Sequence, residues 1–286
     1  MSGRTGKVGP AFAVVSAILS ASSVAPAATK LDEPPKAVWV THPDAAPKGA
    51  VTLEFRRDFD LASVPAHALV KVSADNRFVL YVNGSRVGAG PARGDPTHWR
   101  YETYDLSPYL RAGHNHLGAL VWNWGGLAPM AQMTVQTGFL LEAEDSRQAF
   151  LDSGPDWRVE IDHGFGATSP FMKLMKYGWY YAAGPSETID AVKRDWSWND
   201  EREAGSSWAN AVPAVAAGSE APWHLIPDSL PPMRFAPSEV GRVVRADLPN
   251  ASEFPSRPVT IGAHRKTRIL LDHGTVFSAF PKLRNI

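Results

Sequence analysis

The chain has 286 residues, 29 Lys and Arg side chains against 29 Asp and Glu, and no cysteine. The balanced charge argues against a nucleic-acid surface, which needs a basic excess to displace phosphate counterions. The absence of cysteine excludes disulfide frameworks, thiol nucleophiles and thiolate zinc sites. A hydrophobic fraction of 44%, with ten Trp, excludes a disordered chain and predicts a sizeable buried core.

Residues 1–27 have the pattern of a secretory signal peptide. Arg4 and Lys7 form a basic start, an apolar run covers residues 11–21, and Ala25-Pro26-Ala27 supplies small residues at the cleavage site. The apolar run is far shorter than the ~20 residues that a membrane span needs. We therefore expect an exported protein, periplasmic or extracellular, without a membrane span after signal removal. The lack of cysteine fits a bacterial source.

Strand patterns follow a polar lead-in at residues 28–49. Residues 51–59 alternate, with Val51, Leu53 and Phe55 on one side, and Thr52, Glu54 and Arg56 on the other. This alternation predicts an antiparallel strand with one solvated face. A second alternating run, residues 77–82, is followed by Asn83-Gly84, whose tolerance of positive φ predicts a tight hairpin.

Further strand patterns continue along the chain to about residue 159. Tyr101–Tyr104 reads as a strand, and a short helical corner with Ser107 as N-cap separates it from the strand at 117–122. Later strand patterns lie at residues 133–135, 138–143 and 148–159. From 160 to 195 the pattern weakens, and the segment is rich in aromatic residues: Phe171, Tyr177, Trp179, Tyr180 and Tyr181.

The domain prediction places one β-sandwich at residues 50–228. Pro231-Pro232 marks a boundary, and residues 229–286 are predicted to be a linker and the start of a second, incomplete β domain. Its strand patterns lie at residues 242–245, 258–261 and 267–272. The predicted fold class is all-β.

Two tripeptides are the best candidates for ligand binding: His98-Trp99-Arg100 and Trp122-Asn123-Trp124. Sugars are recognised by aromatic rings that stack on their C–H faces and by a few polar groups that bond their hydroxyls. Leu120, Trp122 and Trp124 share one face of a strand, so at least one of these Trp is expected to pack in the core. Ligand contact and core packing both remain open for this cluster.

The sequence predicts no catalytic residue and no cofactor. Asp195, Asp200, Glu201 and Glu203 gather near Trp196 and Trp198, in a polar loop that gives no reason for the raised pKa of a glycosidase acid. The preferred interpretation is a solvated loop or a cation site with oxygen ligands, so bound calcium remains an open alternative. His114 and His116 are too close in sequence for a strong metal motif, and no Gly-x-Ser-x-Gly elbow occurs.

Several motifs together resemble the N-terminal region of bacterial α-L-rhamnosidases. They are Ser73–Arg77, Leu80–Gly84, Gly90–Asp95, His98–Asp105 and Val121–Asn123, followed by Ala221–Trp223, Pro231–Met233, Arg268–Asp272 and Ala279–Pro281. The resemblance implies a galactose-binding-like jelly-roll β-sandwich, then further β structure, then an (α/α)6 barrel that carries the catalytic carboxylates. This chain ends before such a barrel, and none of its residues matches a catalytic motif.

The resemblance predicts a function in carbohydrate binding rather than hydrolysis. The chain is expected to be the non-catalytic N-terminal accessory region of a secreted α-L-rhamnosidase-like glycoside hydrolase, either as a fragment or as an early-terminated relative. Its partners would be a rhamnose-containing glycan and an (α/α)6 catalytic domain encoded downstream. The alternative is a stand-alone secreted carbohydrate-binding module without a catalytic partner domain.

Overall fold

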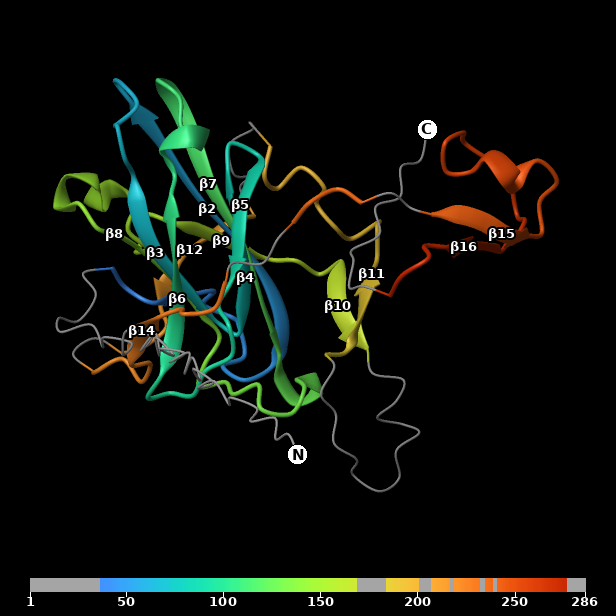
Figure 1. Ribbon diagram of the computed structural model, residues 1–286. Coiled ribbons are helices and arrows are strands. Elements are labelled where there is room, and N and C mark those ends of the chain that lie inside the picture. Colours follow the sequence, from blue (N-terminus) through green and yellow to red (C-terminus); the bar gives the residue numbers. More distant parts are fainter. Residues whose placement is uncertain are drawn as a thin grey trace, which may run out of the picture. The chain divides into compact units, whose positions relative to one another are not determined.

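A computed structural model describes residues 37–168, 184–200, 207–216, 219–231, 235–238 and 241–276 (Figure 1). The chain divides into two compact units, Met1–Leu230 and Pro231–Ile286. The predicted signal peptide and the aromatic stretch from Phe171 to Tyr181 lie outside the described residues. No helix in the described part of the chain is long and apolar enough to span a membrane.

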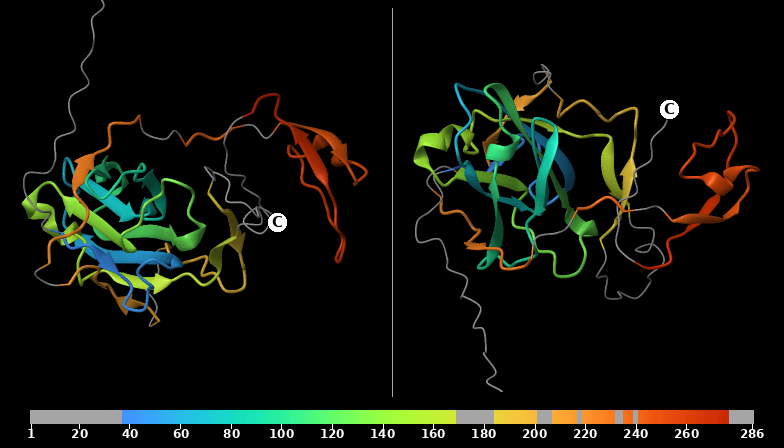
Figure 2. Two further views of the ribbon diagram at one scale, coloured as in Figure 1. Left: turned by 90° about the horizontal axis from the view of Figure 1, so that it is seen from below. Right: turned by 45° about the horizontal axis from the view of Figure 1, so that its top comes forward.

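The first unit is built from two large sheets that lie face to face (Figures 1 and 2). The first sheet has the spatial order β13 (Val212–Pro213), β1 (Val40–Thr41), β8 (Gly138–Ala143), β3 (Leu69–Asp75), β6 (Trp99–Asp105) and β14 (Leu225–Pro227). The second has the order β12 (Ala209–Asn210), β9 (Arg158–Ile161), β2 (Ala50–Leu61), β7 (Gly113–Trp124), β4 (Arg77–Val82) and β5 (Ser85–Gly90). The predicted all-β sandwich is confirmed.

Aromatic rings from both sheets meet in the core. Phe139 of β8 stacks on Phe55 of β2 across the sandwich, with ring centroids 5.3 Å apart, and its other neighbours include Phe78 at 6.5 Å and Trp157 at 5.4 Å. All four side chains are fully buried. In β2, β4 and β8 the buried apolar positions recur at every second residue, because strand side chains alternate between the two faces of a sheet.

The second sheet is organised by the long antiparallel pair β2–β7, which runs from Ala50 opposite Trp124 to Leu61 opposite Gly113. The β4–β5 hairpin lies beside it and turns at Asn83-Gly84, where φ is 49° and 76°. The hairpin predicted from this dipeptide is confirmed. A separate two-stranded sheet pairs β10 (Phe165–Thr168) with β11 (Ser186–Ile189).

Some predicted local elements are wrong. Residues 133–135 form no strand, and residues 146–151 form a 3-10 helix, η3 (Ser146–Leu151), where a strand was expected. The corner before β7 is a 3-10 helix, η1 (Ser107–Tyr109), and its N-cap residue is Leu106 where Ser107 was expected. The backbone N–H of Ser107 donates to the Asp105 carboxylate at 3.0 Å.

The second unit contains an antiparallel pair, β15 (Arg242–Ala246) and β16 (Ile269–Asp272), with a bulge between Val243 and Arg245. A short 3-10 helix, η4 (Ala251–Glu253), lies between these strands in the chain. The strands predicted at 242–245 and 267–272 are confirmed in substance, whereas residues 258–261 form none.

The position of Phe139 at the centre of the sandwich makes a stability prediction. Phe139→Ala should lower the free energy of unfolding by about 3–5 kcal/mol, because it removes buried aromatic surface and leaves a cavity. Urea unfolding followed by tryptophan fluorescence measures the change. Met130→Ala is the control: this side chain is 52% exposed, and its loss should cost about 0.5 kcal/mol or less. A cost below about 1 kcal/mol for Phe139→Ala would contradict the packing described here.

Candidate functional site

Two of the six predicted binding residues are part of the core. Trp99 is 3% exposed, and its indole N–H donates to the carbonyl oxygen of Ala74 at 3.2 Å. Asn123 is fully buried, and its amide nitrogen lies 2.7 Å from the Thr134 hydroxyl. Both side chains are buried and hydrogen-bonded within the sandwich, so packing accounts for both, and their predicted contact with a sugar stays a prediction.

His98 and Arg100 lie at the start of β6, in the first sheet, and contact neighbouring polar groups. His98 Nδ1 is 3.3 Å from the Asp95 carboxylate on an exposed loop. Arg100 Nη1 is 3.6 Å from Asp228 Oδ1. Trp122 and Trp124 belong to β7 of the second sheet, so the structure divides the predicted site between the two sheets.

Trp122 and Trp124 begin a longer row of rings on the outer face of the second sheet. Val121 packs in the core between the sheets, and therefore its neighbour Trp122 points to the opposite, outer face. Trp124 is 6.2 Å from Trp122 and stacks on Phe165 of β10 at 6.0 Å, centroid to centroid.

An arginine continues this row beyond Phe165. The Arg194 guanidinium lies 5.2 Å from the ring centroid of Phe165 and 5.3 Å from that of Trp196. Both distances are in the range of cation–π contacts. The aromatic–arginine column consists of Trp122, Trp124, Phe165, Arg194 and Trp196.

Two buried carboxyl groups hold Arg194 in place. Its Nη1 is 2.8 Å from Asp162 Oδ2, and its Nη2 is 3.9 Å from Glu54 Oε1. The side chains of Asp162 and Glu54 are 1% and 2% exposed, and that of Arg194 is 10% exposed. Asp162 is itself fixed, because its Oδ1 accepts from the backbone N–H of Gly164 at 2.8 Å. The carboxyl groups of Asp162 and Glu54 therefore fix the orientation of the Arg194 side chain.

The electrostatics of this site depend on the protonation of Glu54. Burial first, and then the adjacent Asp162 charge, raise the pKa of the Glu54 carboxyl to about 9, against the opposing effect of Arg194. Glu54 is therefore protonated at neutral pH. The neutral Glu54 therefore lies beside the ion pair of Asp162 and Arg194.

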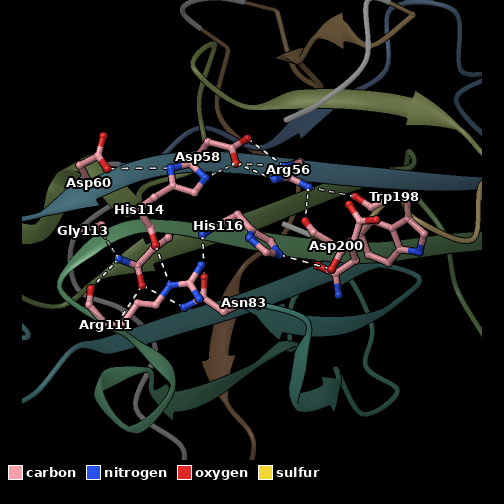
Figure 3. A network of polar contacts seen from close by, with 12 residues as sticks. Arg56, Asp58, Asp60, Asn83, Arg111, Gly113, His114, His116, Trp198 and Asp200 are labelled. Carbon is pink, nitrogen blue, oxygen red and sulfur yellow. Dashed lines mark hydrogen bonds and ion pairs between the residues drawn. The ribbon is translucent and has the colours of Figure 1, made fainter. Parts of the chain in front are cut away.

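Residues 194–200, here called the covering segment, lie across the outer face of the second sheet. Trp198 is 8% exposed and meets Tyr81 edge to face at 5.6 Å. Arg56, which is fully buried, donates to the carbonyl oxygens of Trp198 and Asp200 at 3.4 and 2.8 Å (Figure 3). His116 Nε2 is 3.3 Å from the carbonyl oxygen of Asn199.

The covering segment corrects two predictions. Thr52, Glu54 and Arg56 were expected to face solvent, yet they are only 1%, 2% and 1% exposed. The loop around Asp195 and Asp200 was expected to be solvated. Asp195 is exposed, whereas Trp198 and the backbone of Asp200 are packed against the sheet. Glu201 and Glu203 lie outside the described residues. Glu54 and Arg56 lie on the same face of β2, and these two charged residues were the sequence signal for a polar cluster on that face.

A second pair of carboxyl groups, Glu102 and Asp228, lies near Arg100. Burial, followed by a hydrogen bond with Asp228, raises the pKa of Glu102 to about 7. In both pairs the carboxyls are in direct contact, whereas a glycosidase holds its two carboxyls ~5–9.5 Å apart with the scissile bond between them. Two shallow depressions on the described surface are lined by other residues. Neither pair has the geometry of a hydrolytic site.

The chain is similar in sequence and in fold to parts of known proteins. No family model matches the chain. An α-L-rhamnosidase of Streptomyces avermitilis is 25% identical over 255 residues, which cover 84% of this chain and 23% of that protein. The GH78 family rhamnosidase of Bacillus sp. GL1 is 27% identical with a TM-score of 0.64, over 74% of this chain and 22% of the solved one. The α-L-rhamnosidase from Dictyoglumus thermophilum shares the fold, with 22% identity, a TM-score of 0.51, and 74% and 24% coverage.

The fold and these matches define the class of the chain: an all-β region related to a part of glycoside hydrolases. The particular relatives are α-L-rhamnosidases, as the sequence motifs indicated. The chain spans about a quarter of the length of the relatives it matches, which fits an N-terminal region.

The raised pKa of Glu54 predicts a pH dependence of stability. Between about pH 4.5 and 9, the folded chain keeps a proton that the unfolded carboxyl releases, so the contribution of Glu54 to the free energy of unfolding falls as the pH rises. Glu54→Gln removes this titration, and the variant should lose less stability than the parent between about pH 6 and 9.

Urea unfolding at several pH values measures the difference. Glu144→Gln, at an exposed position, is the matched control and should follow the parent. Parallel pH profiles for the parent and Glu54→Gln would show that Glu54 does not keep its proton in the folded chain.

Proposed function

We propose that the chain is a non-catalytic, sugar-binding accessory region of an exported α-L-rhamnosidase-like glycoside hydrolase. The relationship to α-L-rhamnosidases supports the enzyme class, and the coverage of 22–24% of each relative supports a region of such an enzyme over a stand-alone module. The signal pattern at residues 1–27 supports export.

The observation that carries the sugar-binding part is the aromatic–arginine column. Aromatic rings that line up along a surface offer flat apolar faces, on which the C–H faces of pyranose rings stack. Trp122, Trp124 and Phe165 are each partly exposed, so their rings are shared between packing and the surface. Because the relatives of this chain are rhamnosidases, we expect the bound glycan to contain rhamnose.

The carboxyl pairs support a non-catalytic role for the described residues. Glu54 and Asp162 are engaged with Arg194, and Glu102 and Asp228 with each other. Bond cleavage is accordingly assigned to a separate catalytic domain, the (α/α)6 barrel implied by the resemblance. This region would position a rhamnosylated glycan for that domain or form one wall of its site.

The proposal predicts binding without turnover. The full chain after removal of residues 1–27 should bind rhamnosylated oligosaccharides with a Kd of about 1 mM or tighter, which corresponds to about −4 kcal/mol. Titration calorimetry measures the binding, and release of the chromophore from an aryl α-L-rhamnoside measures hydrolysis, which should stay at the level of buffer.

Two results would contradict different parts of the proposal. Absence of any saturable heat with rhamnosylated glycans would remove the sugar-binding role. Sustained hydrolysis of the aryl rhamnoside by the purified chain would remove the non-catalytic role, and Glu54→Gln and Glu102→Gln would then show which carboxyl pair is responsible.

A further inference from the structure

The two units of the chain carry opposite net charges. Pro231–Ile286 has nine Lys and Arg side chains against four Asp and Glu, a net charge of +5. Met1–Leu230 has 20 against 25, a net charge of −5. The balanced total of the whole chain is therefore the sum of an acidic and a basic unit. A basic excess confined to one unit favours an anionic partner for that unit.

Much of this basic excess directly precedes β16. Residues 264–268 have the sequence His-Arg-Lys-Thr-Arg, and they lead into β16 at Ile269. The side chains of Arg265, Lys266 and Arg268 are exposed. No acidic residue interrupts this stretch, so three positive charges lie within four positions of the chain.

The strand register adds Arg245 of β15 to these residues. Arg245 lies opposite Leu270, and the backbone N–H of Asp247 donates to the carbonyl oxygen of Arg268 at 3.0 Å. Because opposed residues and alternate residues of a strand pair share one face, these four side chains lie on the same face of the β15–β16 pair. Together with Ile269 they line a depression of about 290 Å³. The basic cluster consists of Arg245, Arg265, Lys266 and Arg268.

Few carboxylates oppose the basic cluster. Asp272 pairs with Arg242 at 3.4 Å, and Glu253 pairs with Arg257 at 2.9 Å. Asp247 shares the face of the cluster, and within the described residues no ion pair joins it to a basic side chain. When Asp247 is included, four positive charges stand against one negative charge, so the cluster can accept further negative charge.

The chemistry of the cluster favours a carboxylate ligand. A guanidinium presents a planar fork of N–H donors that matches the two oxygens of a carboxylate. Leu270, opposite Arg245, is 57% exposed and adds apolar surface beside these donors. A sugar ring that carries a carboxylate combines an apolar C–H face with an anionic group, and it therefore fits both features.

Charge density separates a polysaccharide from a nucleic acid. Duplex DNA carries one charge per ~1.7 Å of its axis, and binding it requires a large basic excess. The first unit has a net charge of −5, so a long duplex would be repelled by most of this chain. A chain of uronic acids carries one charge per sugar, and the second unit alone can neutralise a short stretch of it.

We propose that the basic cluster, together with Leu270, is a binding site for a linear polysaccharide that carries carboxylate groups. Arg245 and Arg268 pair with carboxylates of the bound stretch, while Arg265 and Lys266 add attraction over the range of the Debye length. The inference goes beyond the proposed function, because the ligand is anionic and the site uses no residue of the aromatic–arginine column.

Two ligands with the same backbone test the ligand class. Polygalacturonate carries a carboxylate on every sugar, whereas its methyl ester carries none. Titration calorimetry of the full chain after signal removal should show saturable binding of polygalacturonate and about tenfold or more weaker binding of the ester. Binding should also weaken about tenfold between about 50 and about 200 mM salt, because it releases counterions. Equal binding of both ligands, or binding that salt does not change, would overturn the proposal.

A short DNA duplex tests the other class of polyanion. At equal ionic strength it should bind more weakly than polygalacturonate. Tighter binding of the duplex would assign the basic cluster to nucleic acid and overturn the assignment to a polysaccharide.

Two double variants test the place of the site. Arg245→Gln with Arg268→Gln should weaken polygalacturonate binding about fivefold or more, because each removes an exposed charge contact. Arg265→Gln with Lys266→Gln changes residues outside the strands. It should weaken binding as well, and it covers the case in which the first variant disrupts the β15–β16 pair. If both double variants bind as the parent does, the site is wrong.

The matched control removes two charges from the same unit. Arg242→Gln with Arg257→Gln changes two exposed arginines that are already paired with carboxylates. It should bind polygalacturonate within about twofold of the parent. A loss as large as that of the cluster variants would show that net charge alone decides binding, and the defined site would fall.

A neutral rhamnosylated oligosaccharide separates this inference from the proposed function. The cluster variants should bind it as the parent does, because the aromatic–arginine column is unchanged. If the parent binds this ligand and not polygalacturonate, the anionic site is wrong and the proposed function stands. If it binds polygalacturonate alone, the proposed function fails and the anionic site stands.

Discussion

The buried ion pair between Asp162 and Arg194 is the contact on which the outer face of the second sheet depends. Two charges that leave water must be paired, because an isolated buried charge costs several kcal/mol. Here Glu54 remains protonated, so that one carboxylate meets one guanidinium. Once Arg194 is fixed in this way, Phe165 and Trp196 are fixed by their contacts with its guanidinium. The same contact thus links the sheet to the surface rings.

Arg56 fixes the backbone of the covering segment, as Asp162 fixes the side chain of Arg194. Its guanidinium pairs with Asp58 at 2.8 Å and bonds two carbonyl oxygens of the segment, so its buried charge is fully engaged (Figure 3). Trp198 adds apolar contact on the same face. Polar anchors of this kind specify one position of a segment more strictly than apolar packing alone, because each donor needs its own acceptor.

Local features of the sandwich could be predicted from the sequence. The packing of residues 194–200 over the outer face of the second sheet could not. The alternation in β2 and the Asn83-Gly84 turn depend on neighbouring residues, and the sequence shows them directly. The burial of Glu54 depends on Arg194, which is 140 positions away, so the alternation of β2 was misread as a solvated face. Trp122 and Trp124 were found because tryptophan is conspicuous, whereas Phe165 and Arg194 join them only through the fold.

The central claim is that the rings ordered by Arg194 form the surface at which a sugar binds. Two-dimensional NMR of the indole N–H signals, with Trp196 assigned from Trp196→Phe, tests it most directly. On addition of methyl α-L-rhamnoside, the account predicts that the Trp196 signal shifts with saturation, while those of the buried Trp99 and Trp157 stay in place. A saturable shift elsewhere with no change at Trp196 would contradict it.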